Sequence, residues 1–170
     1  MPEPSLRISG VAGVSHHQLF LFDARTGIED VRRPSWREGA GLAAAEPGLL
    51  ALCTGIHTGS IALAVELWDG APPHEPGWED VVEVPLRVSP GELRVGLLLE
   101  EPPPELRVPL PIGGPRCRAR VHATGRDVDY DCAASEPVEE HLVRLWETEV
   151  EDPIRVLRAT SGCATWRLGR

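Results

Sequence analysis

Two adjacent histidines, His16 and His17, lie at the head of the apolar run QLFLF (18–22). Imidazole is the commonest metal ligand among protein side chains and also serves as a general acid or base. Neighbouring residues of a β-strand point to opposite faces, so the two rings reach one metal ion only if the strand breaks there. We therefore expect no metal at this position, and one histidine inside with a hydrogen bond to the backbone.

The other residues that could do chemistry do not form a known catalytic or metal-binding motif. DVDYD (127–131) places three aspartates two apart, but an EF-hand needs glycine at the sixth position and glutamate at the twelfth, where this chain has Cys132 and Val138. Cys53 lies four residues before His57, without an identifiable Asn or Asp partner. No cysteine pair has zinc-ligand spacing. We predict no catalytic residue, no metal and no cofactor.

The charges of the chain are concentrated in one segment. The net charge is −9 over 170 residues, and every basic residue is arginine. Residues 127–152 contain ten acids and one arginine, which sum to −9, so the remaining chain is neutral. Direct binding to nucleic acid needs a cationic surface. We therefore expect no direct contact with nucleic acid, and the acidic segment permits a protein partner with a basic surface.

The elements that position these residues follow a period of two, which is typical of strands. Residues 82–88 and 92–97 alternate between apolar and polar on either side of the turn Ser89-Pro90-Gly91, which predicts a hairpin with one dry and one wet face. Segments with the same alternation are 61–67, 106–110, 116–123, 141–146 and 154–159. Near the start, 5–9 is expected as an edge strand and 17–22 as a buried one.

About eight to ten short strands, separated by proline and glycine turns, indicate an all-β fold. We predict one domain over residues 1–170: an antiparallel β-sandwich, or flattened barrel, with little helix. One short helix is expected at 36–45, although its two glycines weaken it.

Arg116, Arg118 and Arg120 share one face of a predicted strand. A basic row of this kind can grip phosphates. The balanced charge of the body favours instead cross-strand pairing with carboxylates. The expected carboxylate partners are Glu83, Glu92 and Glu105.

The acidic segment encloses the strand-like run HLVRLW (141–146), so we expect this strand to dock on the body between two exposed acidic loops. Exposed acids add little to folding but can steer a basic partner; the alternative is that they neutralise the arginine row. Trp78 lies in the loop APPHEPGWED and could anchor an interface or cap the end of the sandwich. The candidate partner-binding residues are Trp78, Asp127, Asp129, Asp131, Glu147, Glu149, Glu151 and Asp152.

The stretch SHHQLFLFDA (15–24) resembles the N-terminal signature of the competence protein J family, small inhibitors of the bacterial DNA-entry nuclease. His17, Gln18 and Phe20 match the family's Tyr-His-Gln-Phe-like run, with His16 in place of the tyrosine and a leucine before the phenylalanine. The strand and turn patterns of three further segments are similar to the family's: 34–52, 78–95 and 108–125. The resemblance covers about residues 5–125 and excludes the acidic segment. It implies that His17, Gln18 and Phe20 belong to a fold signature.

The resemblance also implies a non-enzymatic bacterial protein that binds and silences another protein, an inhibitor or immunity-like protein for a nuclease or toxin. The alternative is a structural or scaffolding protein within a larger bacterial assembly; an enzyme or a sugar- or lipid-binding sandwich is a third class. Met-Pro-Glu-Pro does not resemble a secretory signal, and no apolar run approaches the roughly 20 residues of a membrane span. We therefore expect a cytoplasmic protein.

Overall fold

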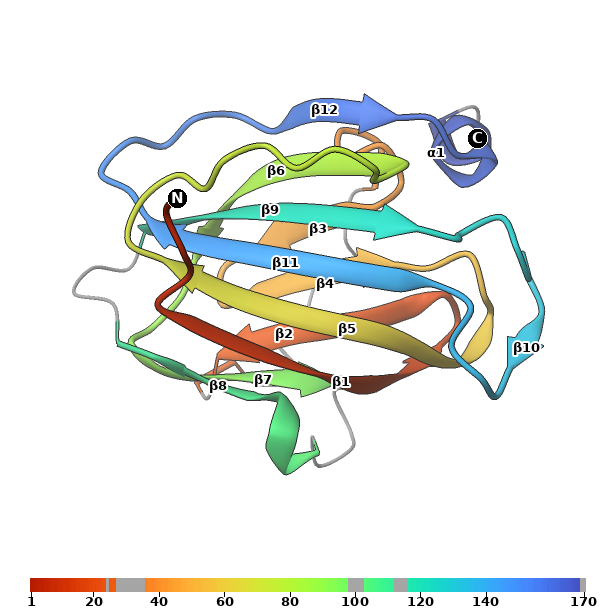
Figure 1. The fold of residues 1–170 in the computed structure, drawn as a ribbon, viewed down its shortest axis with the longest axis horizontal. Coiled ribbons are helices and arrows are strands. Elements are labelled where there is room, and N and C mark those ends of the chain that lie inside the picture. Colours follow the sequence, from red (N-terminus) through yellow and green to blue (C-terminus); the bar gives the residue numbers. More distant parts are fainter. Residues whose placement is uncertain (24, 27–35, 98–102, 112–115, 169–170) are drawn as a thin grey trace.

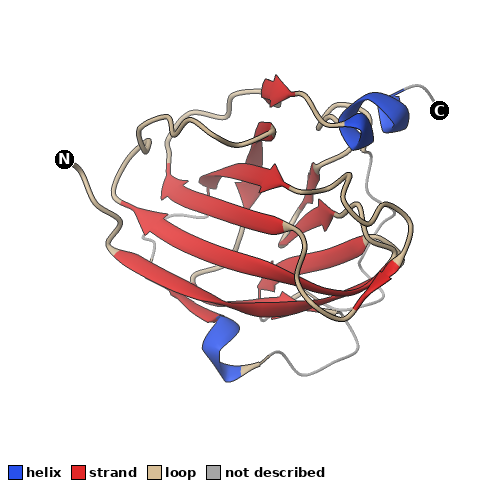
Figure 2. Cartoon of the chain, turned by 45° about the vertical axis from the view of Figure 1, so that its right-hand side comes forward, coloured by secondary structure: helices blue, strands red, loops and turns tan. Residues whose placement is uncertain are grey.

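The computed structural model describes residues 1–23, 25–26, 36–97, 103–111 and 116–168. Residues 166–168 are described by their backbone only. In these residues strands predominate, with one 3-10 helix and one short α-helix (Figure 2). The strands are β1 (Leu6–Ser15), β2 (Gln18–Asp23), β3 (Ala43–Glu46), β4 (Leu49–Cys53), β5 (Thr58–Trp68), β6 (Asp80–Arg87), β7 (Gly91–Gly96), β8 (Arg107–Leu110), β9 (Arg116–Thr124), β10 (Ala133–Ala134), β11 (Glu140–Glu147) and β12 (Arg155–Ala159); the helices are η2 (Pro104–Leu106) and α1 (Gly162–Leu168). The predicted all-β class with little helix is confirmed.

All the strands belong to one curled sheet. Its order is β12-β6-β9-β11-β5-β1-β2-β4-β3, and β7 and β8 extend it from β2. After the β1–β2 turn the chain passes behind the front strands, so that β2, β3 and β4 lie behind β5, β9 and β11 (Figure 1), and β3 comes into contact with β6. The sheet is thus an open half-barrel, and the prediction of a closed sandwich is wrong. The prediction of purely antiparallel pairing is also wrong, because β11 and β10 run parallel to β5.

The main core fills the concave side of this sheet, and the period of two predicts its members well. In β5 the inward residues are Ile61, Leu63, Val65 and Leu67, and in β9 they are Cys117, Ala119, Val121 and Ala123. A smaller cluster forms on the other side of β2, where Phe20 and Phe22 pack with Leu49 and half-buried Trp36.

The predicted hairpin of residues 82–97 is wrong in its pairing, although both strands exist. β6 pairs with β9 and β12, whereas β7 pairs with β2 and β8. The connection passes from the front layer to the back layer, with Val88 buried and the Ser89 N–H bonded to Oδ2 of Asp23 at 2.9 Å. The expected wet face of β6 is wrong as well, since Glu83 is buried. Alternation identifies the inward face of each strand but not its neighbour.

Two further local predictions are wrong. Residues 36–42 form turns and not a helix, because Ala40 and Gly41 have φ of 52° and 62°, in the left-handed region that a right-handed helix excludes. At Gly39 a Cβ would lie 1.8 Å from the carbonyl oxygen of Ala43. The expected edge strand at 5–9 is part of β1, which pairs with β5 along its whole length and lies inside the sheet order.

A row of six charged side chains crosses the outer, convex face of the sheet. Each is the Cα partner of the next on the neighbouring strand, in the order Arg155, Glu83, Arg120, Arg144, Glu66 and Arg7. We call this row the charge ladder. Its four central members are buried, with side chains 2–8% exposed, whereas Arg155 and Arg7 at the ends are about half exposed. Glu83 pairs with Arg118, Arg120 and Arg155. The expected pairing of the arginine row with Glu83 is therefore confirmed, while Glu92 pairs instead with Arg94 on its own strand.

The proline-rich loop 69–79 covers the centre of the charge ladder. The carbonyl oxygens of Pro72 and Pro73 accept hydrogen bonds from Arg120 at 2.8 and 3.1 Å. The Pro73 carbonyl also accepts one from Arg144 at 3.2 Å, and Glu75 pairs with Arg144. Burial raises the pKa of the Glu83 carboxyl, but the hydrogen bonds and charges of Arg120 and Arg155 together outweigh burial, so the net shift is downward.

The charge ladder generates a prediction for Glu83. Glu83→Ala leaves the guanidinium groups of Arg118 and Arg120 buried without their carboxylate, and breaking a buried pair in this way costs about 3–5 kcal/mol of unfolding free energy. Urea denaturation followed by circular dichroism measures this loss. The matched control is Glu92→Ala, which breaks the exposed pair with Arg94 and should cost about 0–1 kcal/mol. Equal losses in the two variants would contradict the assignment.

His122 generates a second prediction, for pH. The ring lies on the outer face of β9, 1% exposed, with its Nδ1 3.1 Å from the Leu142 carbonyl oxygen. The pKa of His122 is lowered from 6.5 to about 4, mainly by burial. The hydrogen bond to Leu142 raises this pKa, whereas the positive charges of Arg144 and Arg120 lower it further. Because the folded pKa lies below the unfolded one, the stability that this ring contributes is present above pH 6.5 and is lost as the pH falls toward 4.

Replacing the ring should remove that pH dependence. Between pH 6.5 and 4 we expect the unfolding free energy of the wild type to fall by roughly 3 kcal/mol more than that of His122→Gln, measured by urea denaturation at each pH. His74→Gln, which changes an exposed histidine, should follow the wild type. Parallel pH profiles for the wild type and His122→Gln would show the prediction to be wrong.

Candidate partner-binding surface

Strand β11 divides the acidic segment into two groups at opposite ends of the sheet (Figure 1). The expected docking of 141–146 as a strand is confirmed, since all six residues are buried between β9 and β5. β11 has eight residues and is therefore about 23 Å long at roughly 3.3 Å per residue. The acidic residues before and after it cannot form one continuous patch.

The acidic residues that precede β11 take part in the fold. Asp127 is exposed, and its carboxylate accepts the backbone N–H groups of Gly162 and Cys163 at 2.7 and 3.0 Å, at the start of α1. Partial burial raises the pKa of Asp127, but these hydrogen bonds outweigh burial and hold it below its ordinary value. Asp129 is half-buried, and Asp131 is exposed and pairs with His17 at 2.9 Å.

His16 and His17 form the two-residue turn between β1 and β2. Their φ values are 52° and 65°, and the turn is closed by the pair Ser15 and Gln18. Positive φ at both central positions is the geometry of the turn that fits the twist of a hairpin. The strand expected from residue 17 therefore begins at Gln18, and the two rings are not on opposite faces of a strand.

His17 connects three segments of the chain. Its half-buried ring lies with Nδ1 3.2 Å from the Thr54 carbonyl oxygen, the predicted backbone hydrogen bond, and with Nε2 2.9 Å from Oδ1 of Asp131. Both neighbours are acceptors, so both hydrogen bonds form only when each ring nitrogen carries a proton. The ring centroid of His57 lies 5.0 Å from that of His16 and 5.1 Å from that of His17.

The other signature residues and the cysteine lie in the sheet. Gln18 pairs with Cys53 of β4, and Phe20 belongs to the small cluster around Leu49. The Cys53 thiol is buried beside the Thr54 carbonyl oxygen, and Nδ1 of His57 bonds to the Thr58 hydroxyl. Within the described ranges no group of three or more His, Cys, Asp or Glu residues is arranged to hold a metal ion.

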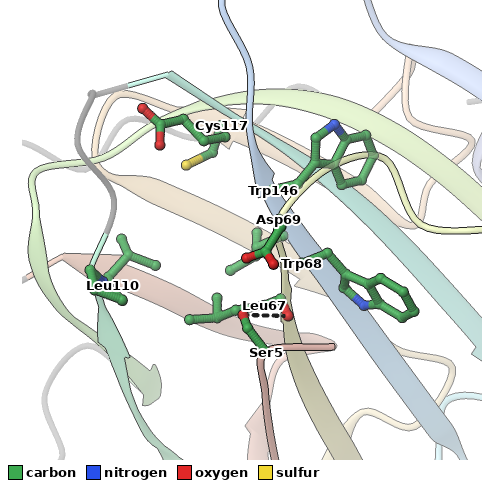
Figure 3. A pocket seen from close by; sticks show the side chains of 10 residues that line it. Ser5, Leu67, Trp68, Asp69, Leu110, Cys117 and Trp146 are labelled. Carbon is green, nitrogen blue, oxygen red and sulfur yellow. Dashed lines mark hydrogen bonds between the residues drawn. The ribbon is translucent and has the colours of Figure 1, made fainter. Parts of the chain in front are cut away.

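A pocket of about 170 Å³ opens at the other end of the sheet, where β5 and β11 end (Figure 3). These strands are parallel neighbours, with Trp68 opposite Trp146, so Asp69 and Glu147, the residues that follow, stand at the same edge. The hydroxyl of Ser5, which also lines the pocket, donates to the Leu67 carbonyl oxygen at 3.1 Å. The remaining lining is largely apolar and consists of Leu67, Trp68, Leu110, Pro111, Cys117, Leu145 and Trp146.

The acidic residues after β11 contact the arginine row through their backbone. The carbonyl oxygens of Asp152 and Pro153 accept hydrogen bonds from Arg118 at 2.5 and 2.7 Å, and that of Glu149 accepts one from Arg116 at 3.3 Å. Among carboxylates of this loop, that of Glu151 pairs with Arg87 at 2.6 Å. Those of Glu147, Glu149 and Asp152 form no ion pair within the described part of the chain. We call residues 147–152 the acidic loop; the side chains of Glu147, Glu149 and Asp152 are exposed.

Trp78 lies apart from the pocket. It is half-buried, and its ring centroid is 5.4 Å from that of His122 on the outer face. The pocket itself was not found from the sequence, because it depends on the pairing of β5 with β11. Its signal, an aromatic–acid pair at the end of each strand (Trp68-Asp69 and Trp146-Glu147), is visible only once those strands are known to be parallel neighbours.

Comparison with known proteins shows similarity in fold without close similarity in sequence. No family model matches the chain, and no curated protein matches it. Among the described residues no helix is long and apolar enough to cross a membrane.

Two solved structures are similar. ComJ from Bacillus subtilis, described as the inhibitor of the DNA degrading activity of NucA, is 14% identical with a TM-score of 0.59, and the match covers 87% of this chain and 99% of ComJ. The product of crocagin biosynthetic gene J is 17% identical with a TM-score of 0.54, over 85% of this chain and 98% of that one. This chain has the fold of ComJ, so the resemblance to the competence protein J family is confirmed at the level of fold.

Proposed function

We propose that this protein is a non-enzymatic binding module that blocks a nuclease or toxin with a basic surface. The observation that carries the proposal is a group of exposed carboxylates at and after the ends of β5 and β11, those of Asp69, Glu147, Glu149 and Asp152, which form no ion pair with another described residue. The fold shared with ComJ, described as a nuclease inhibitor, supports the same class of function. Its proposed place of action is the cytoplasm.

The distribution of charge supports a basic partner. The central arginines of the charge ladder are buried and bound by Glu66, Glu83 and backbone carbonyls, so they contribute little to the field outside the protein. The carboxylates of Glu147, Glu149 and Asp152 are outside that network and create a negative potential. Such a field raises the association rate of a cationic partner and makes the rate dependent on salt.

A structural role in a larger assembly is the second candidate, and the edge strand β12 favours it. β12 ends the sheet order, and its Val156 and Leu157 are 46% and 39% exposed. Contacts through these apolar residues would depend little on salt. The two candidates therefore differ in the salt dependence of partner binding.

The test compares two triple variants with equal changes of charge. The acidic-loop variant carries Glu147→Gln, Glu149→Gln and Asp152→Asn; the control carries Glu3→Gln, Glu136→Gln and Glu140→Gln, which are exposed residues outside the loop. A partner is first captured from a lysate of the source organism, purified, and assayed for nuclease or toxin activity with and without the protein. Association rates are then measured by surface plasmon resonance at several salt concentrations.

We expect the wild type to inhibit the partner, and the acidic-loop variant to associate about tenfold more slowly with a weaker dependence on salt. The control should retain the wild-type rate at each salt concentration. If the acidic-loop variant binds and inhibits like the wild type while only its thermal stability falls, the proposed role of the loop is wrong.

A further inference from the structure

The interior of the pocket is uncharged. Four of its lining residues, Leu67, Leu110, Cys117 and Leu145, are at most 7% exposed. The sulfur of Cys117 faces the pocket (Figure 3) and has no hydrogen bond within the described part of the chain. Burial, helped by the charge of Glu147, raises the pKa of this thiol to about 12, so it is neutral. A volume of about 170 Å³ is below the roughly 300 Å³ at which small-molecule pockets begin, and is closer to the size of one side chain.

The rim of the pocket carries two negative charges. Asp69 and Glu147 are exposed, and neither forms an ion pair with another described residue. They follow directly the opposed residues Trp68 and Trp146, on strands about 4.8 Å apart. Like charges on adjacent strands repel each other. A cation from outside, placed between them, would relieve the repulsion.

The two indoles that adjoin the rim already hold cations of this chain. The guanidinium of Arg144 lies 5.3 Å from the ring centroid of Trp68, and that of Arg120 lies 5.4 Å from that of Trp146. A cation of the partner is therefore expected at the carboxylates and not on the aromatic faces.

From this arrangement, and on the basis of the proposed function, we infer that the pocket binds an aliphatic side chain of the partner protein. The residue next to it in the partner's sequence is an arginine or lysine, and its cation pairs with Asp69 and Glu147. A cation deep in the pocket would lose water without gaining a charged partner, which is costly. An aliphatic group inside and a cation at the rim satisfy both parts of the site. Arginine is preferred over lysine, because its planar fork can reach two carboxylates at once.

The probes are three blocked hexapeptides of glycine with a central Leu-Arg, Ser-Arg or Leu-Glu pair. Each is titrated into ¹⁵N-labelled full-length protein, and the indole N–H signals of Trp68 and Trp146 are followed by NMR. We expect Leu-Arg to shift both signals saturably, with a Kd on the order of 1 mM. Ser-Arg and Leu-Glu should bind at least fivefold more weakly. Equal shifts with all three peptides, or none with Leu-Arg, overturn the inference.

Two variants separate the parts of the site. Asp69→Asn with Glu147→Gln should weaken Leu-Arg binding about fivefold and bring it close to that of Leu-Glu. The matched control, Glu136→Gln with Glu140→Gln, changes the same charge near the start of β11, at the opposite end of this strand from the pocket, and should bind like the wild type. Ser5→Trp changes an exposed residue that lines the pocket and should fill it, so that no peptide shifts the signals. Wild-type titrations for the rim variant or for Ser5→Trp contradict the inference.

The same variants distinguish this inference from the proposed function. If the wild type and Ser5→Trp inhibit the captured partner equally well, the proposed function stands and the pocket is not its contact. If no inhibited partner exists but Leu-Arg still binds as expected, the chemistry of the pocket stands and the proposed function fails.

Discussion

Six charged side chains lie in register across β12, β6, β9, β11, β5 and β1 on the convex face of the sheet. Because the central four are buried, their charges and hydrogen-bonding groups need partners within the protein. Four arginines and two glutamates leave the row short of negative charge, so other acceptors must lie over it. Glu75 and the carbonyls of Pro72 and Pro73 supply them for Arg120 and Arg144. Proline has a carbonyl acceptor but no N–H donor, so proline-rich loops suit this position. The loop 69–79 is thereby fixed without regular secondary structure.

This constraint also determines where free negative charge remains. Arg118, next to the charge ladder, is bound by Glu83 and by the carbonyls of Asp152 and Pro153. Because Glu83 and these carbonyl groups satisfy Arg118, the carboxylates of Glu147, Glu149 and Asp152 form no ion pair with another described residue, whereas that of Glu151 pairs with Arg87. The loop is thus held to the sheet by its backbone and presents its charges to the outside. At Asp152 the backbone carbonyl thus stabilises the fold while the carboxylate is exposed.

The sequence predicts individual elements of this fold better than their arrangement. The period of two identifies the inward residues of β5, β6 and β9, because burial of one strand face is a local pattern. The neighbour of each strand depends on the curl of the sheet, which is why β6 and β7 do not form the expected hairpin. The turn at His16 and His17 lacks the usual Asn-Gly signal, although histidine is enriched at positive φ. The pocket needs β5 and β11 side by side, and residues paired there, such as Glu66 and Arg144, are 78 positions apart.

The position of β11 determines when the sheet can be completed during synthesis of the chain. This strand lies between β5 and β9, yet both precede it in the chain. A ribosome therefore releases β5 and β9 well before the strand that joins them, and the nascent sheet stays divided until residue 147 has emerged. Parallel, long-range pairing of this kind is slow to form. Because β11 also supplies Leu145 and Glu147 to the pocket, the pocket is complete only after this strand has joined the sheet.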